Sequence, residues 1–179
     1  MTILDHFHQK ELVDLLNKCW MTHDGMWFFH SLQHHGIAAA NETNKAAIAS
    51  LAPIEVHRLK KALGFENGIE TIETLKRFFS SASDLVIPDF MNVKWDFSAG
   101  DRLSWAFEKG SCFAYKGICR MGVIDEYECG VLHRIRCWLN VLEVSHEFDP
   151  QFHRCLMHTR GKCSGTIWLR EFPGRKAHG

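Results

Sequence analysis

Residues 93–107, VKWDFSAGDRLSWAF, carry the clearest fold signal in the chain. Apolar and polar residues alternate over 93–97 and again over 103–107, and the stretch 99–102 between them is typical of a turn. Alternation with a period of two places the apolar side chains on one face of a strand. The stretch therefore predicts a β-hairpin with one aromatic face. The side chains of that face are Trp95, Phe97, Trp105 and Phe107.

The residues before this hairpin predict helices, because apolar residues recur there three and four positions apart. Thr22 is expected to cap the start of a helix, Gly36 to follow a helix end, and Pro53 to occupy the first turn of the next helix. The five expected helices cover residues 12–20, 23–35, 37–51, 53–63 and 69–82. This part of the chain is therefore predicted to be a helical bundle.

The residues after the hairpin mix helical and strand patterns. Residues 112–120 fit either a short helix or a continued strand. Helical spacing returns over 126–142, and strand patterns follow at 144–148 and 166–172. The predicted fold class is therefore α+β, with an N-terminal helical bundle packed on a C-terminal antiparallel sheet of ββαββ order.

One domain is expected over residues 1–179, because the length suits a single core and no linker or repeat interrupts the chain. The helical half covers residues 1–85 and the ββαββ half covers residues 86–173. Residues 174–179 are polar and are expected to form a frayed tail.

The charge balance and the N-terminal residues restrict the cellular setting. The chain carries 21 Lys and Arg against 21 Asp and Glu, so it lacks the basic surface that attracts nucleic acid. The start, MTILDHFHQKELVDLL, has no secretory pattern, and no run of 18 apolar residues predicts a membrane span. We therefore expect a cytoplasmic protein without a membrane partner. Its seven cysteines, an odd number, then indicate reduced thiols and not a disulfide framework.

A histidine-rich face is predicted on one helix. His23, Trp27, His30 and His34 follow one another at helical spacing, so they share one face. Histidines four residues apart, such as His30 and His34, can clasp one metal ion. Alternatively, His23, Trp27 and His30 form an aromatic wall that binds a flat organic ligand, or the face is ordinary polar and aromatic packing. The sequence leaves these three interpretations open.

The cysteines of the second half predict a reactive or metal-binding centre. Cys129 stands at the expected start of a helix, where the helix dipole lowers the pKa of a thiol. Cys155 and Cys163 flank a loop, with His153 and His158 nearby. Thiolate and imidazole ligands suit Zn²⁺, whereas the alternative is a set of separate buried thiols. Haem is not expected, because no C-x-x-C-H motif is present. Cys19 and Cys137 are expected to be core residues.

Two stretches of the helical half carry a family resemblance. WMTHDGMWFFHSLQ, residues 20–33, and NKAAIASLAPIEVHRLKKALG, residues 44–64, resemble a family of uncharacterised cytosolic proteins of mainly anaerobic prokaryotes. That family is distantly similar to the L-2-amino-thiazoline-4-carboxylic acid hydrolases, which open a small sulfur–nitrogen ring. The resemblance implies cysteines near Cys112 and Cys129 and a closing pair like Cys155 and Cys163.

The spacing Cys129–x25–Cys155–x7–Cys163 and the ββαββ order resemble the 4-vinyl reductase domain, a zinc-bearing sensor of small ligands. The resemblance implies a zinc ion on these three cysteines. Those sensors complete the site with a glutamate, whereas this chain has Phe152 at that place. His153, His158 or water would then supply the fourth ligand.

The leading hypothesis is a small-molecule-binding protein similar to the 4-vinyl reductase domain, with a structural zinc ion. Its pocket would lie between the helical half and the aromatic hairpin. The expected ligand-binding residues are His23, Trp27, His30, Trp95, Trp105 and Arg134.

The alternative is a hydrolase or lyase acting on a small cyclic or sulfur-containing substrate. Cys129 would be the nucleophile, or a metal-bound water would attack. His23 or His30 would act as acid or base, and Arg134 would anchor a carboxylate. A third interpretation is an adaptor whose aromatic hairpin docks a partner, and a homodimer is left open.

Overall fold

The computed structural model describes residues 6–171 and has an α+β fold, as the sequence predicts. The helices are α1 Gln9–Leu63, α2 Ile72–Val86, α3 Phe113–Met121, α4 Gly130–Val141 and α5 Leu156–Arg160, with a 3-10 turn at Asp89–Met91. The strands are β1 Val93–Asp96, β2 Arg102–Phe107, β3 Ser145–Asp149 and β4 Ser164–Glu171. The predicted tail, residues 174–179, and the end of the last predicted strand lie outside the described residues.

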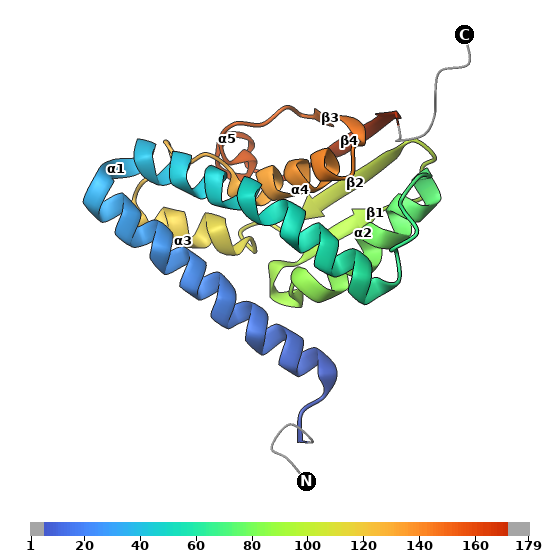
Figure 1. Cartoon of the computed structure of the whole chain (residues 1–179). Helices are drawn as coiled ribbons and strands as arrows, with labels where there is room; N and C mark the ends of the chain where they lie inside the picture. The colour runs from blue at the N-terminus through green and yellow to red at the C-terminus, as the bar shows by residue number, and fades with distance from the viewer. Residues whose placement is uncertain (1–5, 172–179) are drawn as a thin grey trace.

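Helix α1 consists of two arms that fold back on each other at Gly36 (Figure 1). Gly36 has a φ of 79°, a conformation that glycine adopts without steric cost, so the predicted helix end there is confirmed. Thr22 lies inside the first arm and caps nothing, and Pro53 lies inside the second arm, so these two predicted boundaries are wrong. Pro53 and Ala49 are both exposed, and water can therefore hydrate the carbonyl that the proline leaves unpaired. The first four expected helices are thus two.

The four strands form one antiparallel sheet in the order β1-β2-β4-β3. The predicted hairpin is confirmed, with Trp95 directly opposite Trp105. The undecided stretch 112–120 is helix α3, so two helices separate the strand pairs, and α5 interrupts the second pair. The basic order of two strands, helix and two strands is retained.

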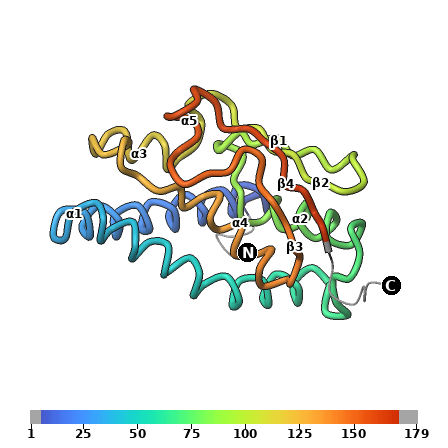
Figure 2. Tube along the Cα trace, turned by 90° about the horizontal axis from the view of Figure 1, so that it is seen from above, coloured from blue at the N-terminus to red at the C-terminus, as the bar shows by residue number. Residues whose placement is uncertain are grey.

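The core forms where α4 lies between α1 and the sheet (Figures 1 and 2). Trp138 of α4 packs against Phe79 of α2 with a ring separation of 5.9 Å, and Phe79 packs against Trp95 at 6.3 Å. The aromatic face of the hairpin therefore closes on two helices. Within residues 6–171, no helix is long and apolar enough to cross a membrane.

Candidate functional site

A cavity of about 160 Å³ lies between the two arms of α1 and the helices α3 and α4. The first arm of α1 supplies one wall through Trp20, Asp24 and Phe28. These positions are four residues apart, so they share one face of the helix. The remaining walls include Asn44, Ile48, Phe113, Tyr127 and Arg134. The cavity is therefore mainly apolar and has a few polar groups at defined places.

A second cavity of about 90 Å³ adjoins the first and reaches the aromatic hairpin. Met21, Val131 and Arg134 line both cavities, so we describe them as two lobes of one cavity. The second lobe is lined further by Trp95, Phe107, Trp138 and Pro88. The indole N–H of Trp95 is buried and has no hydrogen-bond partner among residues 6–171. This lobe lies where the sequence predicts a pocket, between the helical half and the hairpin.

Arg134 stands between the two lobes and is held by Glu55 of the second arm. Its Nε donates to Glu55 Oε2 at 2.9 Å, and a second guanidinium nitrogen donates to Glu55 Oε1. Glu55 is only 8% exposed and also accepts a hydrogen bond of 2.7 Å from Trp138 Nε1. The guanidinium carbon lies 4.7 Å from the ring centroid of Trp20. Arg134 is thus a rigid group whose charge is already balanced, and not an exposed ion pair.

Asp24 lines the first lobe, with its side chain partly open to solvent. Partial burial raises the pKa of the Asp24 carboxyl, and the charges of Arg134 and His23 oppose that shift. An anionic ligand in this lobe would therefore meet a carboxylate on one side. The sequence contains a signal for this wall, because Trp20, Asp24 and Phe28 recur at helical spacing just as the histidine face does.

The predicted aromatic wall of His23, Trp27 and His30 lines neither lobe, so the structure does not bring these residues together with Trp95 and Arg134. All three side chains are exposed on the outer face of the first arm, where Trp27 Nε1 donates to His23 Nε2 at 3.1 Å. The opposite face of the same arm forms the cavity. Of the other predicted ligand-binding residues, Trp95 and Arg134 line it, whereas Trp105 is buried in the sheet.

Four buried thiols meet at a separate, narrow cavity of about 10 Å³. Cys112, Cys129 and Cys155 precede the first residues of α3, α4 and α5, and Cys163 precedes β4. Three helix N-termini therefore converge on this cluster, although no sulfur makes a normal cap hydrogen bond. The family resemblance also implied a cysteine near Cys112, and Cys112 lies in this cluster with the other three.

Burial controls the protonation of these thiols. It raises the pKa of the Cys129 thiol well above its ordinary value, and the backbone N–H of Leu132 opposes this only in part. Burial likewise raises the pKa of Cys163 to about 12, against the influence of Trp105. The lowered pKa predicted for Cys129 is therefore wrong, because loss of hydration outweighs the helix dipole. A protonated, buried thiol gives no support to Cys129 as the nucleophile of a hydrolase or lyase.

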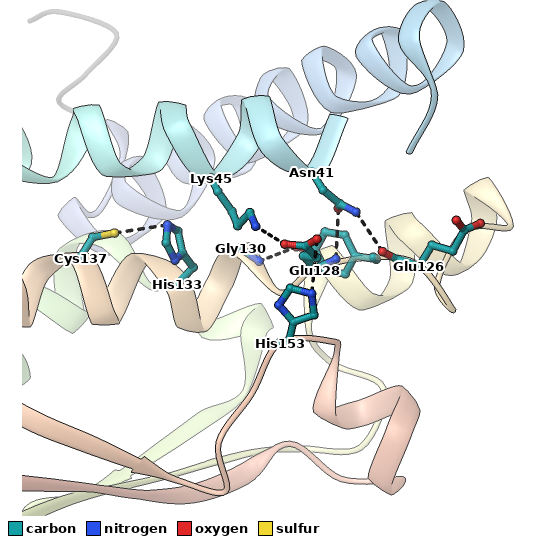
Figure 3. A network of polar contacts seen from close by, with 9 residues as sticks. Asn41, Lys45, Glu126, Glu128, Gly130, His133, Cys137 and His153 are labelled. Atoms are coloured by element: carbon teal, nitrogen blue, oxygen red, sulfur yellow. Dashed lines mark hydrogen bonds and ion pairs between the residues drawn. The ribbon is translucent and has the colours of Figure 1, made fainter. Parts of the chain in front are cut away.

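The two histidines predicted as extra metal ligands, His153 and His158, contact carboxylates and not the thiols. His153 Nε2 is 3.5 Å from Glu128 Oε1 (Figure 3), and His158 Nε2 is 2.7 Å from Asp125 Oδ1. Within residues 6–171, no three Cys, His, Asp or Glu side chains are placed so that they could hold a metal ion. The zinc ion that the cysteine spacing implies therefore stays a prediction.

A polar network fastens the segment before α4 to the second arm of α1 (Figure 3). Asn41 donates to the carbonyl of Glu126 at 2.9 Å and accepts from the backbone N–H of Glu128 at 3.1 Å. Lys45 pairs with the Glu128 carboxylate. The backbone at Gly130 lies close to the second arm of α1, because a Cβ there would be 2.7 Å from Asn44 Nδ2. This network positions both Cys129 and the first turn of α4, and hence the side of the cavity formed by Val131 and Arg134.

Comparison with known proteins gives one match. Residues 5–86 match the model of a family of unknown function, DUF6125. No curated protein and no solved structure matches the chain. The expected likeness of the helical half to an uncharacterised family is therefore confirmed over residues 5–86. The comparisons give no support to a relation with the thiazoline hydrolases or with the 4-vinyl reductase domain.

Proposed function

We propose that this chain binds a small, neutral, mainly aromatic molecule in the two-lobed cavity around Arg134. The main observation in support is that the Arg134 guanidinium, held by Glu55, lies between two mainly apolar lobes. Apolar walls with a few oriented polar groups are typical of small-molecule sites. The cavity also joins the two halves of the chain, so a bound ligand would stabilise their contact.

The charges around the cavity favour a neutral ligand over a carboxylate. Glu55 already balances the charge of Arg134, and Asp24 adds a carboxyl to the first lobe. A ligand carboxylate would lose its hydration without gaining an unpaired positive charge, which is unfavourable. Arg134 has five N–H donors and uses two of them on Glu55, so it can still donate to a carbonyl or hydroxyl oxygen. In this proposal Arg134 donates hydrogen bonds to a neutral ligand and does not anchor a carboxylate.

A matched pair of probes tests this proposal by titration calorimetry. We expect 2-naphthol to bind at least about 10-fold more tightly than 2-naphthoate, because the two differ mainly in charge. Val131→Phe narrows both lobes and should weaken 2-naphthol binding by a similar factor, whereas Val141→Phe, on the same helix but away from both lobes, should not. Equal binding of 2-naphthol to both variants would contradict the cavity as its site.

The thiol cluster supports a second proposal, that Cys112, Cys129, Cys155 and Cys163 bind one structural Zn²⁺ as four thiolates. The observation in favour is that all four line one cavity, to which no Asp, Glu or His among residues 6–171 contributes. Four thiolates are a common zinc ligand set, and three helix N-termini would favour their negative charge. Rotation of the thiol side chains would be needed to reach metal-binding geometry.

Native mass spectrometry of untagged protein purified under reducing conditions tests the zinc proposal. We expect one zinc per chain, lost in Cys155→Ser together with a clear fall in melting temperature, because metal binding energy is folding energy. Cys19→Ser removes an exposed thiol and serves as the control. Metal-free protein that melts at the same temperature with and without added zinc would refute it.

A further inference from the structure

The outer face of the first arm of α1 is an apolar surface without charge. Leu15, Leu16, Cys19, His23, Met26 and Trp27 are all exposed there. At about 100° per residue, these six positions fall within a sector of about 120° of the helix circumference. We call this sector the outer stripe. It continues through His30 towards the end of the arm at Gly36.

The composition of the outer stripe differs from that of an ordinary solvent-exposed helix face. Over residues 9–35 every Asp, Glu, Lys and Arg falls outside the sector. Trp27 is 68% exposed and Leu16 is 67% exposed. An exposed helix face normally carries the charged residues, while the apolar face packs on the core. Here the opposite face of the arm already lines the cavity, so the arm is apolar on both sides.

We propose that the outer stripe is the contact surface of a homodimer, in which the first arms of two copies pack antiparallel. A two-fold axis at the level of Met21 would place Leu15 and Leu16 of one copy at the height of Met26 and Trp27 of the other. The branched leucine side chains would then interdigitate with the longer Met26 and Trp27 side chains across the axis, which gives even packing. A contact of this kind closes on itself, as is usual for homo-oligomers.

The size of the stripe matches what a stable dimer needs. Leu15, Leu16, Met26 and Trp27 together expose on the order of 450 Å² if a fully exposed large side chain offers about 200 Å². A standard interface buries about 800 Å² per partner, of which slightly more than half is apolar. The four side chains thus supply the apolar part of such an interface. A patch of this size on a monomer is itself a sign of a binding surface.

The charges beside the stripe favour a second copy over a lipid surface. Helices that lie on membranes carry Lys and Arg along the edge of their apolar face. Lys18, the basic residue of residues 9–35 nearest the edge of the sector, lies instead over the ring of Phe90, with its Nζ 5.7 Å from the ring centroid. An arm of this composition has no electrostatic attraction to acidic lipid.

Sedimentation velocity of the full chain from about 1 to 200 μM tests the dimer. We expect a dimer that dissociates on dilution, and a dissociation constant raised at least 10-fold by Leu16→Glu or Trp27→Glu. Ile54→Glu is the matched control, because Ile54 is 50% exposed on the second arm of α1 and lies outside the stripe. All three positions are exposed, so the far-ultraviolet circular dichroism should be unchanged.

Three results would overturn the proposal. They are a monomer at every concentration, equal weakening by Ile54→Glu and Leu16→Glu, and a monomer that co-sediments with phosphatidylcholine–phosphatidylglycerol vesicles through Trp27. The last result would assign the stripe to a lipid surface.

Cross-linking with a short bismaleimide tests the antiparallel arrangement. In a Cys119→Ser background, which removes the other exposed thiol, Cys19 should give a covalent dimer, because the two Cys19 residues lie about 6 Å apart along the axis. Leu15→Cys in a Cys19→Ser, Cys119→Ser background should not, because the two sites would be about 18 Å apart. A parallel pair would link both variants and would refute the arrangement proposed.

Discussion

The two faces of the first arm of α1 have similar residues and opposite surroundings. The inner face, with Trp20 and Phe28, lines the cavity and packs against the rest of the chain. The outer face, with Leu16 and Trp27, is exposed. Helical spacing is the same on both faces, so an aromatic stripe alone does not show which side of a helix is buried. The comparison shows that a helix with apolar residues on both sides offers two packing surfaces. Here the inner face packs within the chain, and the outer face is the surface proposed for a second copy.

The largest expected effect is a difference in stability between alanine variants of two neighbouring aromatic residues, Phe28 on the inner face and Trp27 on the outer face. Phe28→Ala removes a ring that is 8% exposed and packs edge-on against Tyr127 at 5.8 Å. Its loss should lower the free energy of unfolding by about 3–5 kcal/mol. Trp27→Ala, measured by urea denaturation at a concentration where the chain is monomeric, should change it by less than about 0.5 kcal/mol. Equal losses would show that the two faces are not distinct.

The next largest expected effect is the loss of stability when the ion pair between Glu55 and Arg134 is removed. Glu55→Gln removes the buried carboxylate that pairs with the half-buried guanidinium of Arg134, and should cost about 3 kcal/mol of unfolding free energy. Glu42→Gln changes an exposed carboxylate on the same arm and is the control, with an expected effect within about 0.5 kcal/mol. Similar stability of both variants in urea would mean that the Arg134 pair contributes little.

Two glycine-to-alanine substitutions test the wall of the first lobe that faces the first arm of α1. Gly130→Ala forces a Cβ against Asn44 and Ile48, so we expect a loss of about 1–3 kcal/mol in thermal or urea unfolding. Gly117→Ala lies in helix α3, where a Cβ meets nothing within 4 Å, and should stabilise by up to about 1 kcal/mol. Destabilisation by Gly117→Ala would show that the cavity wall tolerates no added methyl group.

The smallest expected effect is a pH dependence at Asp24. Partial burial raises its pKa in the folded chain, so the folded state binds the proton more tightly than the unfolded state. Asp24 therefore costs stability at neutral pH, and this cost disappears as the pH falls below the ordinary pKa of about 4. Asp24→Asn should accordingly raise the melting temperature slightly at pH 7 and leave it unchanged near pH 3. A lower melting temperature at pH 7 would show that its attraction to Arg134 outweighs burial.

The predictable part of the fold comes from features that act within a few residues. The aromatic face of residues 93–107 follows from alternation, and the break at Gly36 follows from the freedom of glycine at positive φ. Thr22 misled because the preference of a threonine for a helix start is small next to the packing of the first arm. Pro53 misled because the carbonyl it leaves unpaired is exposed to water, so the helix continues through it. Local signals therefore predicted the class of fold better than the helix boundaries.

The candidate site was predictable only in its outline. The sequence indicated a pocket between the helices and the hairpin, and it singled out Trp95 and Arg134, which line the cavity. It could not show that Glu55, 79 residues before Arg134, would hold the guanidinium. It also pointed to His23, Trp27 and His30, because spacing gives the face that residues share and not the direction in which that face turns.

The sequence by itself determined an α+β chain, a helical half followed by a hairpin with one aromatic face, and a group of cysteines in the second half. Only the tertiary structure decided which face of the first arm is buried, that Cys112 joins Cys129, Cys155 and Cys163, and that burial raises the pKa of these thiols. The physical reason is the range of the interactions. Periodicity, turns and caps are set by neighbours in sequence, whereas burial, ion pairing and pKa depend on atoms that only folding brings together.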